Sequence, residues 1–257
     1  MSDEHPRGFN YRVLEDAAHR PWPMPQTPWI MTQSWQDLLF AHWRVDPVRL
    51  AALIPKPLEL DLYGGEAWIA VVPFRMEHVT PRGMPAFPWL SAFPEVNVRT
   101  YVRIGDRPGV FFFSLDATNP VAVRVARTVF HLPYFNAGIE LQVDQEGDGF
   151  TRYVSHRTDQ PAADLIVSYR PEWPVFHAAE GTLEYFLTER YCLYAIDRRG
   201  GAHICEIHHA RWPLQVASAR FEVNTLLQGI VDVDPLAPAL LHFSKRQDTI
   251  NWRPGRV

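Results

Sequence analysis

Residues 95–104 show the clearest alternation of polar and apolar side chains in the chain. One set of alternate positions is mainly polar or charged: Glu95, Asn97, Arg99, Tyr101 and Arg103. The other set is mainly apolar: Val96, Val98, Thr100, Val102 and Ile104. Because successive side chains on a strand point to opposite faces, this pattern predicts a β-strand with one polar and one apolar face.

Apolar stretches separated by turn residues predict further strands along the chain. We expect them at residues 38–45, 58–62, 67–79, 110–117, 137–144, 150–156, 163–169, 190–196, 202–208, 215–223 and 239–243. The stretches 58–62 and 67–79 flank Gly64-Gly65, which is typical of a β-hairpin. Asp46-Pro47 and Asn119-Pro120 each combine a capping residue with a proline at the first helical position. They predict short helices over 46–53 and 119–131, and two more helices are expected at 182–188 and 224–229.

The order of these elements indicates the fold class. Predicted strands outnumber helices, and most neighbouring strands are joined by tight turns. The strand–helix–strand alternation typical of a parallel sheet is absent from the pattern. We therefore predict an α+β, β-dominated chain with an antiparallel, closed or strongly curled sheet and a few short helices.

Three regions are expected along the chain. Residues 1–30 contain five prolines, which cannot sustain a helix or a central strand and so predict an extended arm. This arm is expected to pack along the body of the protein or on a partner. Residues 31–247 are expected to form a single domain, followed by a C-terminal tail over 248–257. Within the domain, the proline-rich residues 81–94 are long enough for a lid or a binding loop.

Composition and charge exclude several classes of function. Lys and Arg total 25 against 29 Asp and Glu, and the resulting charge of −4 argues against nucleic-acid binding, which needs a basic excess. The sequence has no signal peptide and no apolar run of 18 residues, so we expect a cytoplasmic protein that is not bound to a membrane. In that reducing setting Cys192 and Cys205 are expected to be buried free thiols. The dinucleotide-binding, P-loop, zinc-protease and serine-hydrolase motifs are absent, and we expect no cofactor.

The densest group of possible metal ligands lies in residues 203–209. His203, Cys205 and His209 share one face of the expected strand, and such side chains can bind zinc. Three ligands in a flat row suit tetrahedral coordination poorly, however, and no second cluster lies near them in sequence. We therefore expect a structural strand there and no bound metal.

The expected helix at 119–131 combines an apolar face with a basic stripe. Arg124, Arg127 and His131 form the stripe, which by itself is typical of a solvated helix surface. The segment from Ala126 to Phe135, however, resembles the catalytic segment of the acetoacetate decarboxylases. Their pattern runs Gly-Arg-Glu, two variable residues, Gly, an aromatic residue, Pro and paired lysines. Arg127 and Pro133 match its arginine and proline at the same separation.

The stretch from Trp35 to Phe243 resembles more closely the uncharacterised YqjF-like family of the acetoacetate decarboxylase-like superfamily. Five segments carry this resemblance: residues 39–43, 67–74, 93–102, 112–117 and 131–135. The resemblance implies a cone-like β-barrel with an internal cavity, to which Glu95 and the Arg127–Tyr134 segment contribute. Glu95 matches a pocket glutamate of the decarboxylases.

The positions of the reactive lysines depart from the decarboxylase pattern. In the decarboxylases one lysine of the pair forms a Schiff base with a β-keto acid. Here Tyr134 and Phe135 stand at those positions, and Lys56 and Lys245 are the only lysines in the chain. The resemblance therefore implies the cavity without the Schiff-base mechanism.

Three classes of function follow from these residues. An enzyme would act on a small keto or carboxylate compound with lyase-like or isomerase-like chemistry. Arg127 or Arg99 would hold a carboxylate, Glu95 or His131 would move a proton, and Tyr134 would donate a hydrogen bond to an enolate oxygen. Alternatively, a non-catalytic binder or sensor would hold a small anionic molecule in the same cavity. An interaction protein would instead use the proline-rich arm and the 81–94 loop, and the sequence leaves a homo-oligomer open.

Overall fold

The computed structural model describes residues 8–85, 87–143 and 149–257. Within them, the strands are β1 (Met31–Val45), β2 (Glu59–Leu60), β3 (Ala67–Pro81), β4 (Phe93–Ile104), β5 (Arg107–Ala117), β6 (Tyr134–Val143), β7 (Thr151–Arg157), β8 (Asp164–Pro171), β9 (Cys192–Ile196), β10 (Ala202–His209), β11 (Gln215–Asn224), β12 (Leu240–Asn251) and β13 (Gly255–Arg256). The helices are the 3-10 helix η1 (Tyr11–Leu14) and the α-helices α1 (Pro47–Ala51), α2 (Pro88–Ser91), α3 (Pro120–Val129) and α4 (Leu183–Thr188). None of these helices is long and apolar enough to cross a lipid bilayer.

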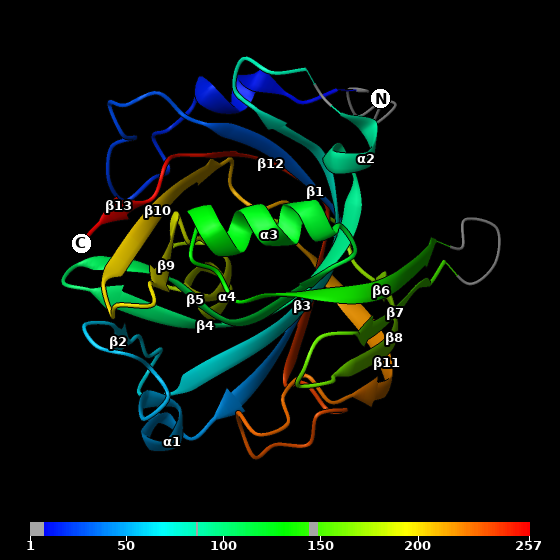
Figure 1. Cartoon of the computed structure of the whole chain (residues 1–257). Coiled ribbons are helices and arrows are strands. Elements are labelled where there is room, and N and C mark those ends of the chain that lie inside the picture. Colours follow the sequence, from blue (N-terminus) through cyan, green and yellow to red (C-terminus); the bar gives the residue numbers. More distant parts are fainter. Residues whose placement is uncertain (1–7, 86, 144–148) are drawn as a thin grey trace.

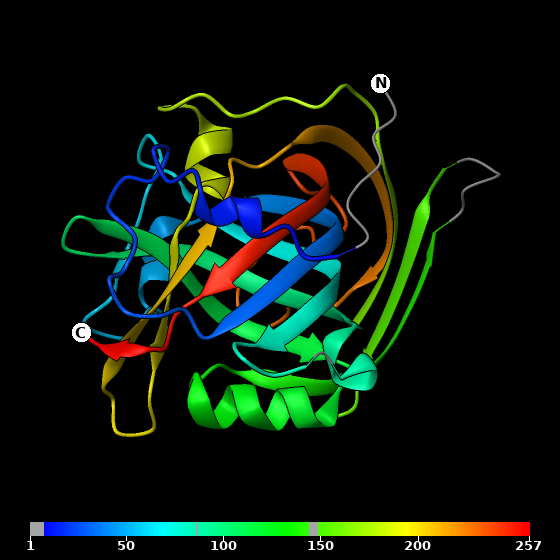
Figure 2. The same cartoon turned by 90° about the horizontal axis from the view of Figure 1, so that it is seen from above.

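All of these strands belong to one sheet, with the order β13-β10-β9-β5-β6-β7-β8-β11-β12-β1-β3-β4-β2. Additional pairings join β10 to β12 and β5 to β4, so the sheet curls back on itself. Figures 1 and 2 show α3 lying across one side of this sheet, next to β6. The predicted β-dominated, strongly curled architecture is confirmed.

One expectation about topology is wrong. β5 and β6 are joined through α3 and pair in parallel, with Leu115 opposite Tyr134, and β5 also pairs in parallel with β9. The crossover helix returns the chain to the start of a strand alongside β5, which a tight turn cannot do. The predicted strand 110–117, helix 119–131 and strand 137–144 already form this unit, but its parallel pairing was not inferred because it is a single crossover among many antiparallel pairs.

β3 lies between β1 and β4 in the sheet and is buried on both faces over Ala67–Phe74, which explains why this segment is apolar throughout. Ala70, Val72 and Phe74 belong to one hydrophobic core, on the inner face of the curl. Ile69 and Val71 belong to a second core, which also contains side chains from β7, β8 and β11. A strand buried on both faces is apolar at every position and shows no alternation, as in the segment Ala67–Phe74.

The helix-start signals are confirmed. The Asn119 side chain accepts hydrogen bonds from the backbone N–H groups of Val121 and Ala122, at 3.1 and 3.0 Å, and Asp46 caps α1 in the same way. The helix expected at 224–229 does not form, because β11 runs through Asn224 and turns follow it at 226–230. The expected hairpin turn at Gly64-Gly65 forms, with Tyr63 and Glu66 paired across it, but the strands do not pair further because β2 pairs with β4.

The described part of the N-terminal arm packs on the protein's own body. Arg20 forms an ion pair with Glu206 at 2.8 Å, and the Trp22 indole donates to the same carboxylate at 2.9 Å. Val13 belongs to a small core with Ile250 and Trp252. Residues 1–7 of the expected arm lie outside the described residues. At the other end, the expected tail begins inside a strand, because β12 continues to Asn251.

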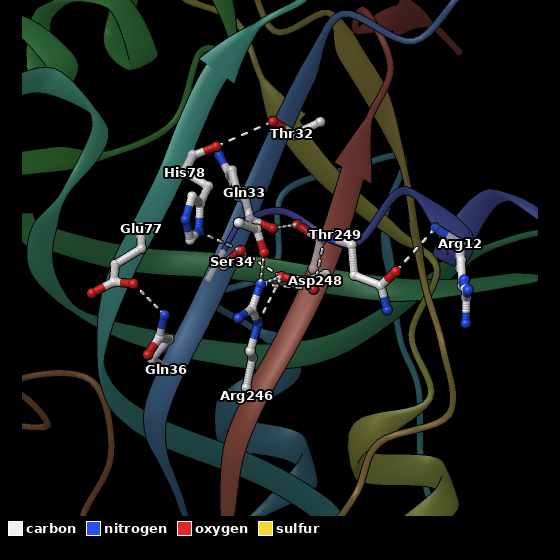
Figure 3. Close-up of polar contacts among 12 residues, drawn as sticks. Arg12, Thr32, Gln33, Ser34, Gln36, Glu77, His78, Arg246, Asp248 and Thr249 are labelled. Atoms are coloured by element: carbon white, nitrogen blue, oxygen red, sulfur yellow. Dashed lines mark hydrogen bonds and ion pairs between the residues drawn. The ribbon is translucent and has the colours of Figure 1, made fainter. Parts of the chain in front are cut away.

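A polar seam joins β1, β3 and β12. Figure 3 shows Ser34 of β1 between His78 of β3 and Asp248 of β12. The Ser34 hydroxyl donates to Asp248, and His78 Nδ1 lies 3.1 Å from the same hydroxyl oxygen. Ser34 is fully buried, and none of the three residues lines the cavity described below. The group therefore ties three strands together and lacks the exposed serine that nucleophilic catalysis requires.

A buried ion pair holds β7 against β5. Arg157 Nε donates to both carboxylate oxygens of Asp116, at 2.9 and 3.0 Å, and both side chains are buried. The Arg157 guanidinium also lies 4.2 Å from the ring centroid of Phe135. Because burial raises the pKa of Asp116 to about 6, this carboxylate depends on its arginine to remain charged at neutral pH.

We expect Arg157→Ala to lower the free energy of unfolding by about 3–5 kcal/mol, because it leaves the buried Asp116 without its partner. Urea denaturation followed by circular dichroism measures the change. Arg152→Ala is the matched control on the same strand, since Arg152 pairs with Glu222 at the exposed surface and its loss should have no measurable effect. Equal losses in the two variants would contradict this assignment.

Candidate functional site

A cavity of about 280 Å³ lies inside the curl of the sheet. Its wall is formed by side chains from β1, β3, β4, β5, β6, β9 and β10, with α2 and α3 contributing near the surface. Most of these side chains are apolar, among them Trp35, Phe74, Phe112 and Leu115. A concave, mainly apolar space with a few polar groups is typical of small-molecule sites, and its volume is close to their lower limit of roughly 300 Å³.

Glu95 and Tyr134 meet in the wall of this cavity. The Tyr134 hydroxyl donates to Glu95 Oε2 at 2.6 Å, and only 1% of Glu95 is exposed. β4 carries Glu95 on its inward face, and the parallel pairing of β6 with β5 brings Tyr134 beside it. The sequence therefore identified two residues that the fold brings into direct contact.

Burial controls the protonation of this pair. It raises the pKa of Glu95 to about 7, although hydrogen bonds from Tyr134 and Asn97 act in the opposite direction; the charge of Asp116 adds to the rise. Burial and the adjacent Glu95 raise the pKa of Tyr134 well above its usual value, so this hydroxyl stays protonated. Glu95 therefore exchanges its proton near neutral pH, which is the property of an effective general acid or base.

Arg99 and Arg190 are the arginines in the cavity wall. Arg99 lies on the same face of β4 as Glu95 and is buried. Arg190 is also buried, but it forms an ion pair with Asp61 at 2.6 Å and its Nε donates to the Phe186 carbonyl. The sequence analysis named Arg99 as one of two possible carboxylate-binding residues and did not identify Arg190.

Arg127 does not line the cavity, contrary to expectation. Its side chain is 43% exposed, and Nη2 forms an ion pair with Asp159 at 2.6 Å. The reason is helix geometry: Ala122, Val125 and Ala126 face the cavity, and the next residue is turned by about 100° around the helix axis. Arg127 instead donates from Nε to the Tyr134 carbonyl at 2.7 Å, so it supports the site residue from outside.

His131 is also absent from the cavity wall. Its ring lies against that of His203, with the centroids 4.8 Å apart, and His203 in turn contacts Asp197 at 2.9 Å. Among the described residues, no three His, Cys, Asp or Glu side chains are arranged to hold a metal ion. Cys205 and His209 do line the cavity.

Both cysteines are free and buried, which confirms the expectation for them. Burial raises the pKa of Cys192 to about 12 and that of Cys205 further still, so neither supplies a reactive thiolate at neutral pH.

Neither lysine lies in the cavity wall. Lys56 is exposed, and Lys245 forms an ion pair with Asp37 at 2.5 Å with half of its side chain exposed. Of the two residues that the sequence resemblance places at the decarboxylase lysines, Tyr134 lines the cavity whereas Phe135 packs against Arg157, because neighbours on a strand face opposite sides.

We expect sodium borohydride with acetoacetate to produce no stoichiometric adduct on this protein, because a Schiff base needs a lysine within reach of the ligand. Intact-protein mass spectrometry after reduction provides the measurement, with a Lys56→Arg, Lys245→Arg double variant as the background control. A reduced adduct in the wild type that is lost in the double variant would show that a lysine reaches the cavity.

The raised pKa of Glu95 predicts a specific dependence of stability on pH. Glu95 ionises near 4.5 in the unfolded chain and near 7 in the folded protein, so stability present below pH 4.5 is lost as the pH rises through 7. We expect Glu95→Gln to gain about 3 kcal/mol relative to wild type between pH 4.5 and pH 8. Urea denaturation at a series of pH values checks this.

The exposed Glu222→Gln serves as the matched control for this measurement. Its difference from wild type should stay constant over the same range, because the Arg152 guanidinium lowers the pKa of Glu222. A difference between Glu95→Gln and wild type that stays constant with pH would mean that folding does not raise the pKa of Glu95.

Comparison with solved structures places the fold among acetoacetate decarboxylase-like enzymes. An acetoacetate decarboxylase-like enzyme from Sphingomonas wittichii RW1 superposes with a TM-score of 0.59 and 15% identity, over 94% of this chain and 98% of that one. The enduracididine biosynthesis enzyme MppR, complexed with pyruvate, gives a TM-score of 0.59 at 13% identity over 92% and 93% of the two chains. Acetoacetate decarboxylase from Legionella pneumophila gives a TM-score of 0.55 at 14% identity over 100% and 98%. Because the sequence identities are only 13–15%, these comparisons show that the fold is shared and do not show a shared activity.

Sequence comparison identifies the family. The chain is 44% identical over 229 residues to the uncharacterized protein YqjF of Bacillus subtilis (strain 168). This alignment covers 89% of this chain and 93% of YqjF. Residues 32–248 match the model of the DUF2071 family, described as an uncharacterized conserved protein. The chain therefore belongs to the DUF2071 family, has an acetoacetate decarboxylase-like fold, and carries neither of its two lysines in the cavity wall.

Proposed function

We propose that the cavity binds a small carbonyl compound and that Glu95, assisted by Tyr134, moves a proton on it. The observation that carries this proposal is the Glu95–Tyr134 hydrogen bond of 2.6 Å in a mainly apolar cavity, where the pKa of the carboxyl is about 7. A carboxyl group that gains and loses its proton at neutral pH suits enolisation, because that reaction needs a base and then an acid at one position.

The proton transfer divides into two balanced steps. The ionised Glu95 accepts a proton from the carbon next to the carbonyl, and the electron pair of that C–H bond forms the enolate. Once protonated, Glu95 donates its hydrogen bond to the Tyr134 oxygen, which frees the Tyr134 hydrogen to stabilise the enolate oxygen. Return of the proton to the same or another carbon regenerates Glu95, so the chemistry is isomerase-like and consumes no co-reactant.

Two further observations support a carbonyl compound as the ligand. The related fold of MppR has been solved with pyruvate, so this architecture accommodates an oxo acid. That support is analogy at the level of the fold. In this chain, the buried Arg99 in the same wall is the group available to bind the anionic part of such a compound.

The second candidate is a non-catalytic binder or sensor. Glu95 accepts hydrogen bonds from Tyr134 and Asn97, and a polar network of this kind also serves to stabilise a binding cavity. The two candidates differ in one property: only the enzyme accelerates exchange of carbon-bound hydrogen with solvent.

We expect the protein to catalyse exchange of hydrogen for deuterium beside the carbonyl of short oxo acids in D₂O, with pyruvate, acetoacetate and 4-oxopentanoate as the probes. Proton NMR measures the rate. Since the ionised Glu95 is the base, the rate should rise with pH around a midpoint near 7. Glu95→Gln should lower the rate by about 100-fold or more, and Tyr134→Phe should lower it less.

Glu222→Gln is the matched control, because Glu222 is exposed and lies outside the cavity, and its rate should equal that of wild type. An exchange rate unaffected by Glu95→Gln would exclude Glu95 as the base. Binding of these probes without any exchange would favour the non-catalytic binder.

A further inference from the structure

Arg99 differs from the other buried arginines of the protein. Arg20, Arg157 and Arg190 each form an ion pair with a carboxylate, at 2.8, 2.9 and 2.6 Å. Arg99 is only 8% exposed and forms no ion pair with any carboxylate of the described residues. Its Nη2 donates to the Leu187 carbonyl at 3.2 Å, and its Nε is buried without a hydrogen-bond partner among the described residues. A buried guanidinium without an anion is unfavourable, so its surroundings are incomplete without one.

Aromatic rings hold Arg99 in the cavity wall. The guanidinium lies 5.1 Å from the ring centroid of Phe40 and 5.9 Å from that of Tyr101. These contacts stabilise the cation. The guanidinium also hydrogen-bonds the Leu187 carbonyl and the Tyr101 side chain, and its remaining donors have no partner among the described residues. Arg190, the other arginine of the wall, is already bound to Asp61. Arg99 is therefore the side chain in this wall that is prepared for a carboxylate.

The guanidinium of Arg99 and the carboxyl of Glu95 are separate polar points in the cavity. They form no ion pair, and Arg99 is not among the groups that shift the pKa of Glu95. Four residues along a strand span about 13 Å between Cα atoms, which explains the separation. Apolar side chains such as Phe112 and Leu115 line the same space. A ligand that contacts both groups must carry its carboxylate and its carbonyl some distance apart.

The outer end of the cavity is apolar. The exposed side chains of its wall include Met84 and Phe87 near α2 and Val121 and Val125 on α3, at 41–51% exposure. Arg99 and Glu95 are both buried. A molecule that enters past these exposed side chains therefore meets apolar surface first and charge last.

From this arrangement we infer that the ligand is a medium-length oxo carboxylic acid. Its carboxylate binds Arg99 at the inner end, its carbonyl faces Glu95 and Tyr134 several carbons away, and its hydrocarbon chain extends toward the apolar mouth. This inference rests on the proposed function for the role of the carbonyl, but the carboxylate site at Arg99 stands independently of any reaction.

Binding of simple fatty acids tests the carboxylate site without chemistry. We expect octanoate to bind at least 30-fold more tightly than octan-1-ol, which has the same chain without the charge, as measured by isothermal titration calorimetry at pH 7.5. Arg99→Gln should remove most of this preference while octan-1-ol binding stays unchanged. Arg103→Gln is the matched control, since Arg103 lies on the same strand but is exposed outside the cavity, and it should behave as wild type.

Two measurements keep this test decisive if Arg99→Gln folds poorly. Arg99→Lys retains a charge and should retain the preference for octanoate. The comparison of octanoate with octan-1-ol in wild type needs no variant at all. Equal binding of the two probes by the wild-type protein, or an undiminished preference in a folded Arg99→Gln, would overturn the assignment of Arg99.

The position of the carbonyl is tested with two isomers of one chain length. We expect deuterium exchange beside the carbonyl to be at least 10-fold faster for 5-oxooctanoate than for 2-oxooctanoate, and to slow in Arg99→Gln. Faster exchange of the 2-oxo isomer would overturn the separation of the two polar points. Tight octanoate binding without exchange in either isomer would reject the proposed proton transfer and uphold the carboxylate site. Exchange that Arg99→Gln does not slow would uphold the proton transfer and reject the carboxylate site.

Discussion

The central sheet is buried on both faces, and this constraint determines most of the polar chemistry inside the protein. Hydrophobic cores cover the sheet on its inner and outer sides, so a charged residue on either face has to find its partner within the protein. Asp116 meets Arg157 on the outer side, and Arg190 meets Asp61 on the inner side. Glu95 meets the Tyr134 hydroxyl, which satisfies a hydrogen bond but supplies no opposite charge.

Burial is the main cause of the raised pKa of both Glu95 and Asp116, but different groups oppose it. The Arg157 guanidinium opposes it at Asp116, whose pKa rises from 3.8 to about 6. Hydrogen bonds from Tyr134 and Asn97 oppose it at Glu95, which has no cationic partner among the described residues and whose pKa rises from 4.5 to about 7. Arg99, in the wall of the same cavity, is a buried cation that forms no ion pair with a carboxylate of the described residues. A buried carboxyl group and a buried guanidinium, each without an opposite charge beside it, are typical of a functional site.

The chemistry proposed for this chain differs from that of the enzymes whose fold it shares. The chain superposes on acetoacetate decarboxylase-like enzymes, whereas the residue that the sequence resemblance places at a reactive lysine is Tyr134, which lines the cavity. A tyrosine hydroxyl with a strongly raised pKa donates hydrogen bonds but forms no Schiff base. The cavity wall is thus suited to hydrogen-bonded acid–base chemistry, in agreement with the general independence of fold and function.

Local sequence determined the elements and part of the site. The alternation over 95–104 fixed which side chains share a face, the Asn119-Pro120 cap fixed the start of α3, and the match around Pro133 identified Tyr134. Only the tertiary structure decided where those faces point. The polar face of β4 turns inward because the sheet curls around it, whereas Arg127 turns outward because the apolar side of α3 already faces the cavity. Periodicity records the geometry within one strand or helix, but burial depends on the elements packed against it, and these come from distant parts of the chain.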